Sequence, residues 1–312
     1  MTARTDASSR AVLDKAAREN FPVAPFFLPA AWRNDLMAVY GCARLVDDAG
    51  DGDLPPGRGD AALLGVPGDA ADDRLVLLDA IERDLLRAFD GAGGAGGTEG
   101  AGSTDGGPRH PLVRALRPTV LRHRLDPGPF LALIEANRQD QRTTRYATWD
   151  DLLAYCDLSA NPVGRLVLAI TGTTSPERLR RSDEICTALQ IAEHLQDVAE
   201  DLARGRIYLP AEDMERFGVT EADLARPTGS RAVRDLVRFE ADRARALLDA
   251  GAPLVGSVRG RLRLLLAGFV AGGRAALAAL EDADHDPLPG PPRASRARLV
   301  REAAAALRGP RR

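Results

Sequence analysis

Cysteines, aromatic residues and excess positive charge are all scarce in this chain. Its 312 residues include three cysteines, and aromatic residues make up 4%. Cys42, Cys156 and Cys186 lie far apart and form no CxxC pair, so they cannot supply a four-ligand zinc site. An odd and sparse set of cysteines is typical of a reducing cytoplasm. The formal net charge of −3 leaves no positive field over the whole molecule, which argues against a general nucleic-acid-binding role.

Long apolar runs are missing as well. The longest, at residues 264–273, is well short of the roughly 20 residues that a membrane-spanning helix needs. The first twenty residues are polar and contain no apolar segment of the kind found in signal peptides. We therefore expect a cytoplasmic protein that is either soluble or attached to a membrane surface.

Apolar residues recur at helical spacing along nearly the whole chain. In residues 30–49, spacings of three and four place on one face Leu36, Val39, Tyr40, Ala43 and Val46. The sequence has no sustained alternation of apolar and polar residues, the pattern that predicts strands. Further helices are expected over residues 9–19, 70–89, 111–123, 129–142, 148–157, 160–171, 177–204, 229–250, 254–281 and 295–308. An all-α bundle is therefore predicted.

Two segments interrupt the helical pattern. Residues 90–107 hold nine glycines in 18 positions, which predicts a flexible insertion. The G-x-G-x-x-G at 91–96 follows no strand, so it fails the context that a nucleotide-binding fingerprint needs. Residues 282–294 are rich in proline. We expect one domain over residues 9–281, followed over 282–312 by a proline-rich linker and a final helix.

Acidic residues form two patterns at helical spacing. In the first, Asp47 and Asp51 are four residues apart and share a helix face with Arg44, and Tyr40 lies two turns earlier. The second pattern has spacings of three, four and four, and it consists of Gln190, Glu193, Asp197 and Asp201. The other faces of the second stretch are apolar, which predicts a central helix.

Either pattern alone also fits a solvated acidic face. Like charges four residues apart cost only about 0.2–0.5 kcal/mol per pair on an exposed helix. Three observations favour a site: the apolar neighbours of the second pattern, the occurrence of two patterns about 150 residues apart, and the nearby arginines Arg44, Arg204 and Arg206.

Two rows of carboxylates in a helical bundle suit hard divalent cations. Mg²⁺ takes oxygen ligands and typically binds one or two carboxylates together with phosphate oxygens. Arginine side chains also bind phosphate oxygens, through paired hydrogen bonds. Such a site neutralises the charge on a leaving diphosphate while the organic fragment departs as a carbocation. No nucleophilic side chain is required for this chemistry.

These residues resemble the squalene/phytoene synthase family, in which two DxxxD motifs on facing helices bind a magnesium cluster and the substrate diphosphate. The segment DDAGD (47–51) is similar to the first motif, and DVAED (197–201) with LARGRIYLP (202–210) is similar to the second. The segment YCDLSANPVGRLVL (155–168) resembles the helix that lines the hydrocarbon pocket. The resemblance implies a single-domain isoprenoid synthase helical bundle with a central hydrophobic cavity.

Three details resemble the hydroxysqualene synthase branch of the family, which serves bacterial hopanoid biosynthesis. They are ENFPV (19–23), RQD (138–140) with the following Arg145-Tyr146, and EHLQD (193–197). Condensing members usually have Asn at the position of Glu193 and Arg at that of Gln196. These departures argue against ordinary head-to-head condensation.

The resemblance implies that presqualene diphosphate ionises on Mg²⁺, rearranges and is captured by water to give hydroxysqualene. The implied metal ligands are Asp47, Asp51, Glu193, Asp197 and Asp201, with Tyr40 as a further catalytic residue. The implied substrate-binding residues are Asn20, Phe21, Arg44, Tyr155, Gln190, Arg206 and Tyr208. The candidates to stabilise the cation by their ring faces are Phe21, Phe26, Phe27, Tyr40 and Tyr155.

Several alternatives stay open at this stage. A related enzyme would condense two prenyl diphosphates to presqualene diphosphate, squalene or phytoene, and a non-catalytic relative would act as a scaffold. Tyrosines at helical spacing are equally typical of packing, His194 fits a core histidine, and Gly50 is expected to mark fraying before Asp51. The expected partner is a prenyl diphosphate rather than nucleic acid. Peripheral membrane contact and hand-over of product to a squalene-forming reductase are further options.

Overall fold

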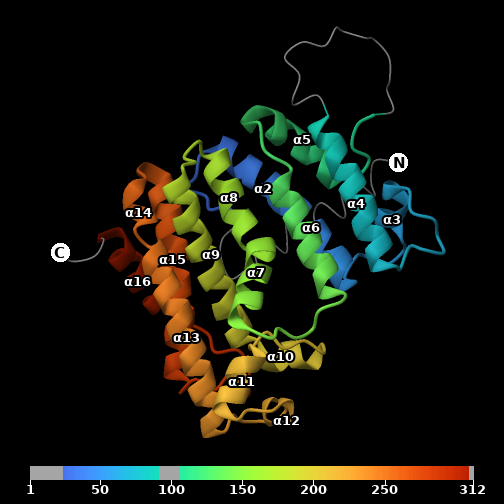
Figure 1. The fold of residues 1–312 in the computed structure, drawn as a ribbon. Helices are drawn as coiled ribbons and strands as arrows, with labels where there is room; N and C mark the ends of the chain where they lie inside the picture. Colours follow the sequence, from blue (N-terminus) through green and yellow to red (C-terminus); the bar gives the residue numbers. More distant parts are fainter. Residues whose placement is uncertain (1–23, 91–105, 309–312) are drawn as a thin grey trace. The chain divides into compact units, whose positions relative to one another are not determined.

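The computed structural model describes residues 24–90 and 106–308. This part of the chain contains helices and one isolated parallel β-bridge, between Arg145 and Ile207, but no β-strand. The all-α prediction is confirmed. The helices of Figure 1 are α2 (Ala30–Asp51), α3 (Gly59–Leu64), α4 (Arg74–Phe89), α5 (Pro111–His123), α6 (Gly128–Asp140), α7 (Trp149–Ser159), α8 (Asn161–Ile170), α9 (Pro176–Gln196), α10 (Val198–Ala203), α11 (Ala211–Phe217), α12 (Glu221–Leu224), α13 (Arg231–Gly251), α14 (Leu254–Ser257), α15 (Gly260–Asp282) and α16 (Arg296–Arg308).

The first of two compact units consists of residues 24–90, 106–142 and 166–172. Its central helix is α2, which packs against α4, α5 and α6. The apolar face predicted for this helix is buried at Leu36, Val39 and Val46. Helix α4 begins at Arg74 rather than residue 70, because the Asp73 side chain accepts hydrogen bonds from the backbone N–H groups of residues 75 and 76.

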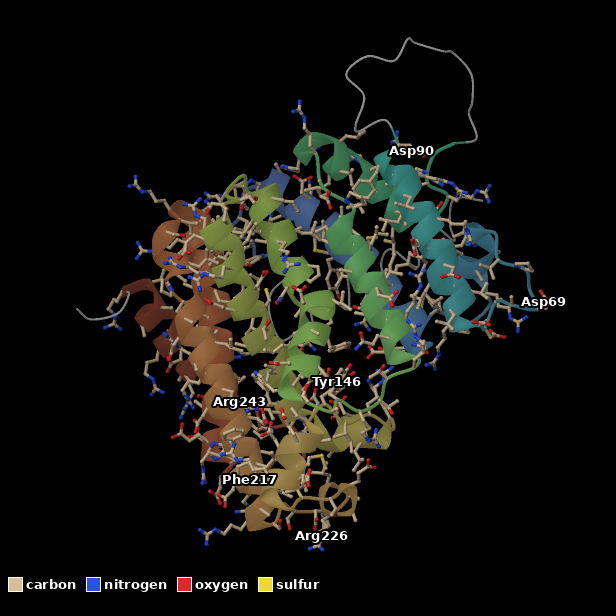
Figure 2. The ribbon with its side chains drawn as sticks, viewed as in Figure 1. Asp69, Asp90, Tyr146, Phe217, Arg226 and Arg243 are labelled. Carbon is tan, nitrogen blue, oxygen red and sulfur yellow. The ribbon has the colours of Figure 1, made fainter. Side chains whose placement is uncertain are left out.

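The second unit consists, within the described residues, of 143–165 and 173–308. Helices α9, α13 and α15 pack side by side, and α16 packs on α15 (Figure 1). Helix α15 is long and apolar enough to cross a membrane, yet 67% of its most apolar window is buried, which is typical of a core helix. On α13, the guanidinium of Arg243 (Figure 2) lies 4.6 Å from the ring centre of Trp149, the first residue of α7.

The predicted helices differ from the observed ones at two junctions. Residues 177–204 form two helices, because the backbone leaves helical geometry at Asp197, with φ −101° and ψ 15°. Residues 254–281 also form two, α14 and α15, separated at Val258 and Arg259. The short helices α3, α11 and α12 were not predicted, because four to seven residues show no periodicity. The predicted helix 9–19 and the glycines at 91–105 lie outside the described residues.

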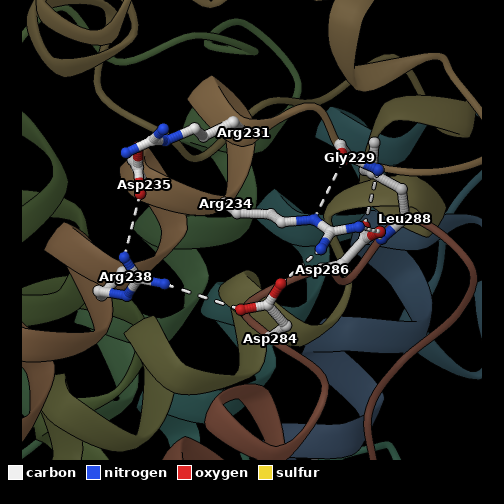
Figure 3. Close-up of polar contacts among 8 residues, drawn as sticks. All are labelled: Gly229, Arg231, Arg234, Asp235, Arg238, Asp284, Asp286 and Leu288. Atoms are coloured by element: carbon white, nitrogen blue, oxygen red, sulfur yellow. Dashed lines mark hydrogen bonds and ion pairs between the residues drawn. The ribbon is translucent and has the colours of Figure 1, made fainter.

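The segment after α15 packs against the start of α13 (Figure 3). Asp286 is buried there, and its Oδ1 accepts hydrogen bonds from the backbone N–H of Gly229 at 2.9 Å and of Leu288 at 3.2 Å. Its Oδ2 pairs with Arg234 at 3.3 Å. The carbonyl of Pro292 accepts a hydrogen bond from Gln196 at the end of α9. The proline-rich segment expected as a linker is therefore bonded to two helices of this unit.

We expect Asp286→Asn to lower the free energy of unfolding by about 1–3 kcal/mol, because a buried charge-assisted pair with Arg234 is lost. The matched control is Asp284→Asn, at a carboxylate whose side chain is 66% exposed and pairs with the same arginine. We expect the control to change stability by about 0.5 kcal/mol or less. Urea denaturation of both variants measures the difference, and equal losses would contradict the structural role given to Asp286.

Candidate active site

The first acidic motif forms the last turns of α2. The helix includes Asp51 and ends at Gly52, which adopts φ 79° and donates its N–H to the carbonyl of Asp48. The expectation that Gly50 marks fraying before Asp51 is therefore wrong. Asp47 and Asp51 remain on one continuous helix, as the spacing predicted.

Close approach of α6 explains the glycine within the motif. A Cβ added at Gly50 would lie 2.0 Å from Oδ1 and 2.8 Å from Cγ of Asn137. Gln141, one turn further along the chain, donates from Nε2 to the carbonyl of Gly50 at 2.9 Å. Gly50 is thus required for packing between α2 and α6, which places an amide side chain against the motif.

Asp47 lies in a crowded, largely dehydrated environment. Its Oδ1 accepts a hydrogen bond from Nδ2 of Asn137 at 3.1 Å. Burial raises the pKa of Asp47 to about 6, and the charges of Asp51 and Asp48 add to this, while Asn137 and Arg44 oppose it. A cation bound here would relieve this crowding of carboxylates.

Asp48 is a further acidic residue of the motif that the sequence did not single out. It is buried, and its Oδ1 lies 2.8 Å from Nε of Arg44, one turn earlier on α2. Arg44, expected to hold a diphosphate, is therefore held in place by Asp48. Tyr40 lies on the same helix and is partly exposed.

The second acidic motif spans the junction of α9 and α10. The backbone N–H of Asp201 donates to the carbonyl of Asp197 at 2.8 Å, and that of Asp197 donates to Glu193 at 3.0 Å, so the predicted spacing persists across the break. Burial raises the pKa of Asp197, and the charges of Asp201 and Glu200 add to it. Glu193 is solvent-exposed, in contrast to Asp197 and Asp201.

Aromatic rings gather beside the second motif. The rings of His194 and Tyr208 stack with centres 3.7 Å apart, and Tyr155 lies 5.6 Å from Tyr208. His194 Nδ1 lies 3.8 Å from Oδ2 of Asp201, and its Nε2 lies 3.1 Å from Nε2 of Gln190. The structure thus brings together four predicted residues, Tyr155, Gln190, Asp201 and Tyr208, around His194.

Tyr146 (Figure 2) completes this cluster and was not predicted as a site residue. It is buried, with its ring centre 5.3 Å from that of Tyr155 and 5.6 Å from that of Tyr208. The cluster offers three tyrosine rings and an imidazole in one place. Its members come from α7, α9 and two connecting segments, so spacing along a single helix could not predict that they lie close together.

Backbone bonds fix the segment after α10, which carries Arg206. Its N–H donates to the carbonyl of Asp201 at 2.8 Å, and the next residue, Ile207, donates to Thr144 at 3.0 Å. Arg145 donates from Nη1 to the carbonyl of Gly205 at 2.7 Å. Nε of Arg145 also lies 2.7 Å from Oε1 of Glu221 in α12. Arg145 thus connects the segment after α10 to α12.

Among the predicted ring candidates, Phe26 lies on the surface of the part of the chain that the structure describes. Its side chain is 88% exposed, and its one ring contact among the described residues is an edge-to-face contact with Phe27, at 5.9 Å. The role of Phe26 in stabilising a cation stays a prediction. Asn20 and Phe21 lie outside the described residues.

The donor set of each motif fits Mg²⁺ bound together with a phosphate group. Within residues 24–90 and 106–308, no three His, Cys, Asp or Glu side chains are placed to hold a metal ion by themselves. Mg²⁺ typically takes only one or two carboxylates and completes its shell with water and phosphate oxygens. Each motif supplies one pair of carboxylates: Asp47 with Asp51 near Arg44, and Asp197 with Asp201 near His194.

Glu240 of α13 is a buried carboxyl that no pattern in the sequence singles out. Burial raises its pKa to about 8, and the nearby Asp213 adds to this while Arg243 opposes it. Between pH 4.5 and 8, Glu240 therefore keeps its proton in the folded protein. In the unfolded chain, where its pKa has the ordinary value near 4.5, Glu240 releases that proton. Stability should fall as pH rises from 4.5 to 8, by on the order of a few kcal/mol.

The variant Glu240→Gln should remove this component of the pH dependence, because glutamine carries no proton to lose. Urea denaturation of the wild type and the variant across this pH range measures it. Parallel stability curves for the two proteins would show that Glu240 does not titrate in this way.

Comparison with known proteins identifies relatives that match most of this chain. The model of the squalene/phytoene synthase family matches residues 14–302. A hydroxysqualene synthase of Zymomonas mobilis is 34% identical over 233 residues, which cover 74% of this chain and 67% of the relative. A phytoene synthase of Mycobacterium tuberculosis is 31% identical over 248 residues, covering 78% of this chain and 71% of the relative.

Solved structures are similar over nearly the full length. A squalene synthase from Alicyclobacillus acidocaldarius has a TM-score of 0.73 and 39% identity, covering 92% of this chain and 98% of its own. A dehydrosqualene synthase has a TM-score of 0.76 at 22% identity, covering 97% and 96%, which supports the fold alone. The chain has the all-α isoprenoid synthase fold of these structures. From the family match and these relatives, we conclude that the chain belongs to the squalene/phytoene synthase family.

Proposed function

We propose that this protein is a Mg²⁺-dependent hydroxysqualene synthase. Presqualene diphosphate loses diphosphate, the resulting cation rearranges, and water adds to give hydroxysqualene and a proton. Bound Mg²⁺ supplies charge neutralisation at the leaving diphosphate. Asp47, Asp51, Asp197 and Asp201 are the proposed ligands, since each pair of carboxylates fits the oxygen-rich coordination that this ion prefers.

The residues around the two motifs have distinct proposed roles. Arg44 and Arg206 hold diphosphate oxygens, and the ion pair between Arg44 and Asp48 keeps that guanidinium oriented along α2. The ring cluster of Tyr146, Tyr155 and Tyr208 supplies aromatic faces near the second motif. Gln190 and His194 orient Asp201 through their mutual contact.

The observation that carries the choice of reaction is the segment EHLQD at 193–197. It places Glu193 and Gln196 where condensing relatives usually carry Asn and Arg. Glu193 is exposed, and Gln196 donates to the carbonyl of Pro292. Glu193 is thus proposed as a replacement ligand or as a group that orients water. The similarity to hydroxysqualene synthases at 31–34% identity agrees with this choice.

The second candidate is head-to-head condensation of two prenyl diphosphates. It is favoured by the similarity to phytoene synthases, whose identities of 30–32% nearly equal those of the hydroxysqualene synthases. Both reactions begin with loss of diphosphate, so the acidic motifs by themselves support either. The substrate must therefore be tested directly.

The proposed setting is the cytoplasm, with a membrane surface within reach for a lipid substrate. Helix α16 leaves Val300 71% exposed and Leu299 38% exposed, close in sequence to Arg296 and Arg301. Apolar and basic residues together suit an anionic lipid surface. Hydroxysqualene would need a reduction to become squalene, which a separate reductase would supply.

Incubation of the purified protein with Mg²⁺ and a single substrate separates the two candidates. We expect presqualene diphosphate to be converted to hydroxysqualene, with ¹⁸O from labelled water in its hydroxyl group. We expect farnesyl or geranylgeranyl diphosphate alone to be left intact. Consumption of either of these, without turnover of presqualene diphosphate, would favour condensation instead.

A further inference from the structure

A small, partly open cavity lies beside the second acidic motif, within the second unit. It is walled by α7, α9, α10, α13 and the segment 206–210, and its volume is about 10 Å³. Its polar wall consists of His194, Asp201, Arg206, Tyr208 and Glu240. A space of this size accommodates about one water molecule, provided that several polar groups surround it.

Glu240 is the wall residue whose hydrogen bonding is incomplete. Its side chain is 1% exposed, and its Oε2 has no hydrogen-bond partner among the described residues. The Glu240 carboxyl group shares a hydrogen bond with Asp213. Its Oε1 also has a long contact with Arg243, at 3.5 Å, and that guanidinium lies closer to Asp213, at 2.7 Å. A buried polar oxygen without a partner is costly, and buried water is the usual remedy in folded proteins.

We propose that this cavity binds one water molecule, held by Glu240 Oε2 on one side and by polar groups of the second motif on the other. Glu240 is then a positioning residue for Asp201 and His194. Asp201 lies 3.8 Å from His194, which is in turn stacked on Tyr208, so an anchor on this wall limits how far all three can move. The water site stands on the cavity itself, whereas the positioning effect rests on the proposed role of Asp201.

Groups that orient metal ligands from behind typically change metal affinity or activity by about 10- to 100-fold when they are removed. We therefore expect Glu240→Met, which keeps the length of the side chain but removes both oxygens, to weaken Mg²⁺-dependent binding of inorganic pyrophosphate by about 10- to 100-fold. Glu240→Gln keeps an oxygen for the water and should bind pyrophosphate within about threefold of the wild type.

Two measurements on the full chain test this inference. High-resolution crystal structures should contain a water within hydrogen-bond distance of residue 240 in the wild type and in Glu240→Gln, but none in Glu240→Met. Calorimetry with pyrophosphate and Mg²⁺ should show similar affinities for the wild type and Glu240→Gln, and a weaker affinity for Glu240→Met.

The two results separate the inference from the proposed function. An empty cavity in the wild-type crystal, or wild-type affinity in a folded Glu240→Met, would overturn the inference. If Glu240→Met does not fold, the wild-type and Glu240→Gln crystals decide the presence of the water. If the wild type fails to bind pyrophosphate while the water is present, the proposed function fails and the water site stands.

Discussion

Replacing either Asp47 or Asp197 with Asn should lower turnover of the prenyl diphosphate by about 100- to 1,000-fold, with unchanged helical content. Asparagine keeps the shape of the side chain but removes the charge that attracts a divalent cation. In each motif burial raises the pKa of the aspartate, and neighbouring carboxylates add to this, so the substitution removes a charge that is costly to bury. The variants should therefore fold at least as well as the wild type while losing activity.

Neighbouring acidic residues provide matched controls for these variants. Asp53 lies just beyond the first motif and Glu200 lies within the second, and both are solvent-exposed. Asp53→Asn and Glu200→Gln remove the same charge and should retain activity within about threefold. Steady-state rates at saturating Mg²⁺ measure all four. Full cellular function in Asp47→Asn and Asp197→Asn would favour a non-catalytic scaffold.

Gly50→Ala should disable the first motif although it adds only a methyl group. The new Cβ would lie 2.0 Å from Oδ1 of Asn137, so that the asparagine must rotate away and release Asp47. We expect turnover to fall by about 10- to 100-fold, as for loss of other groups that orient metal ligands. We also expect stability to fall by about 1–2 kcal/mol, since overpacking outweighs the gain from alanine in a helix.

Gly268→Ala is the matched control, because it makes the same change within α15. A Cβ at Gly268 meets no atom within 4 Å, and the residue lies in the interior of the helix. This variant should gain up to about 1 kcal/mol in stability and keep wild-type activity. Urea denaturation and steady-state rates compare the two variants. Equal behaviour of both would contradict the close approach of α6 to Gly50.

The sequence predicted those parts of the site that depend on spacing along a single helix. The pairs Asp47 with Asp51, and Asp197 with Asp201, were found in this way, and both keep their helical relation. The break at Asp197 was not predictable, since residues 177–204 contain no glycine or proline to mark it. Helices α11 and α12 were not predictable either, because they are too short to show helical periodicity of apolar residues.

Contacts between distant parts of the chain were missed, because no local pattern encodes them. Asn137 reaches Asp47 across 90 positions, and Glu240 reaches the cavity beside the second motif from α13. One signal was present but misinterpreted. Glycine at position 50, within a helical motif, indicated close packing of another element rather than fraying.

Binding of inorganic pyrophosphate, measured by calorimetry, tests most directly the proposal that both acidic motifs are needed for Mg²⁺-dependent diphosphate binding. We predict that the wild type binds pyrophosphate with Mg²⁺ but not with a chelator, and that Asp47→Asn and Asp197→Asn each weaken binding at least about tenfold. The double variant should lose less than the product of the single losses, as expected for residues that act on one ligand. Binding that persists without Mg²⁺, or that is unaffected by substitution in one of the motifs, would contradict the account.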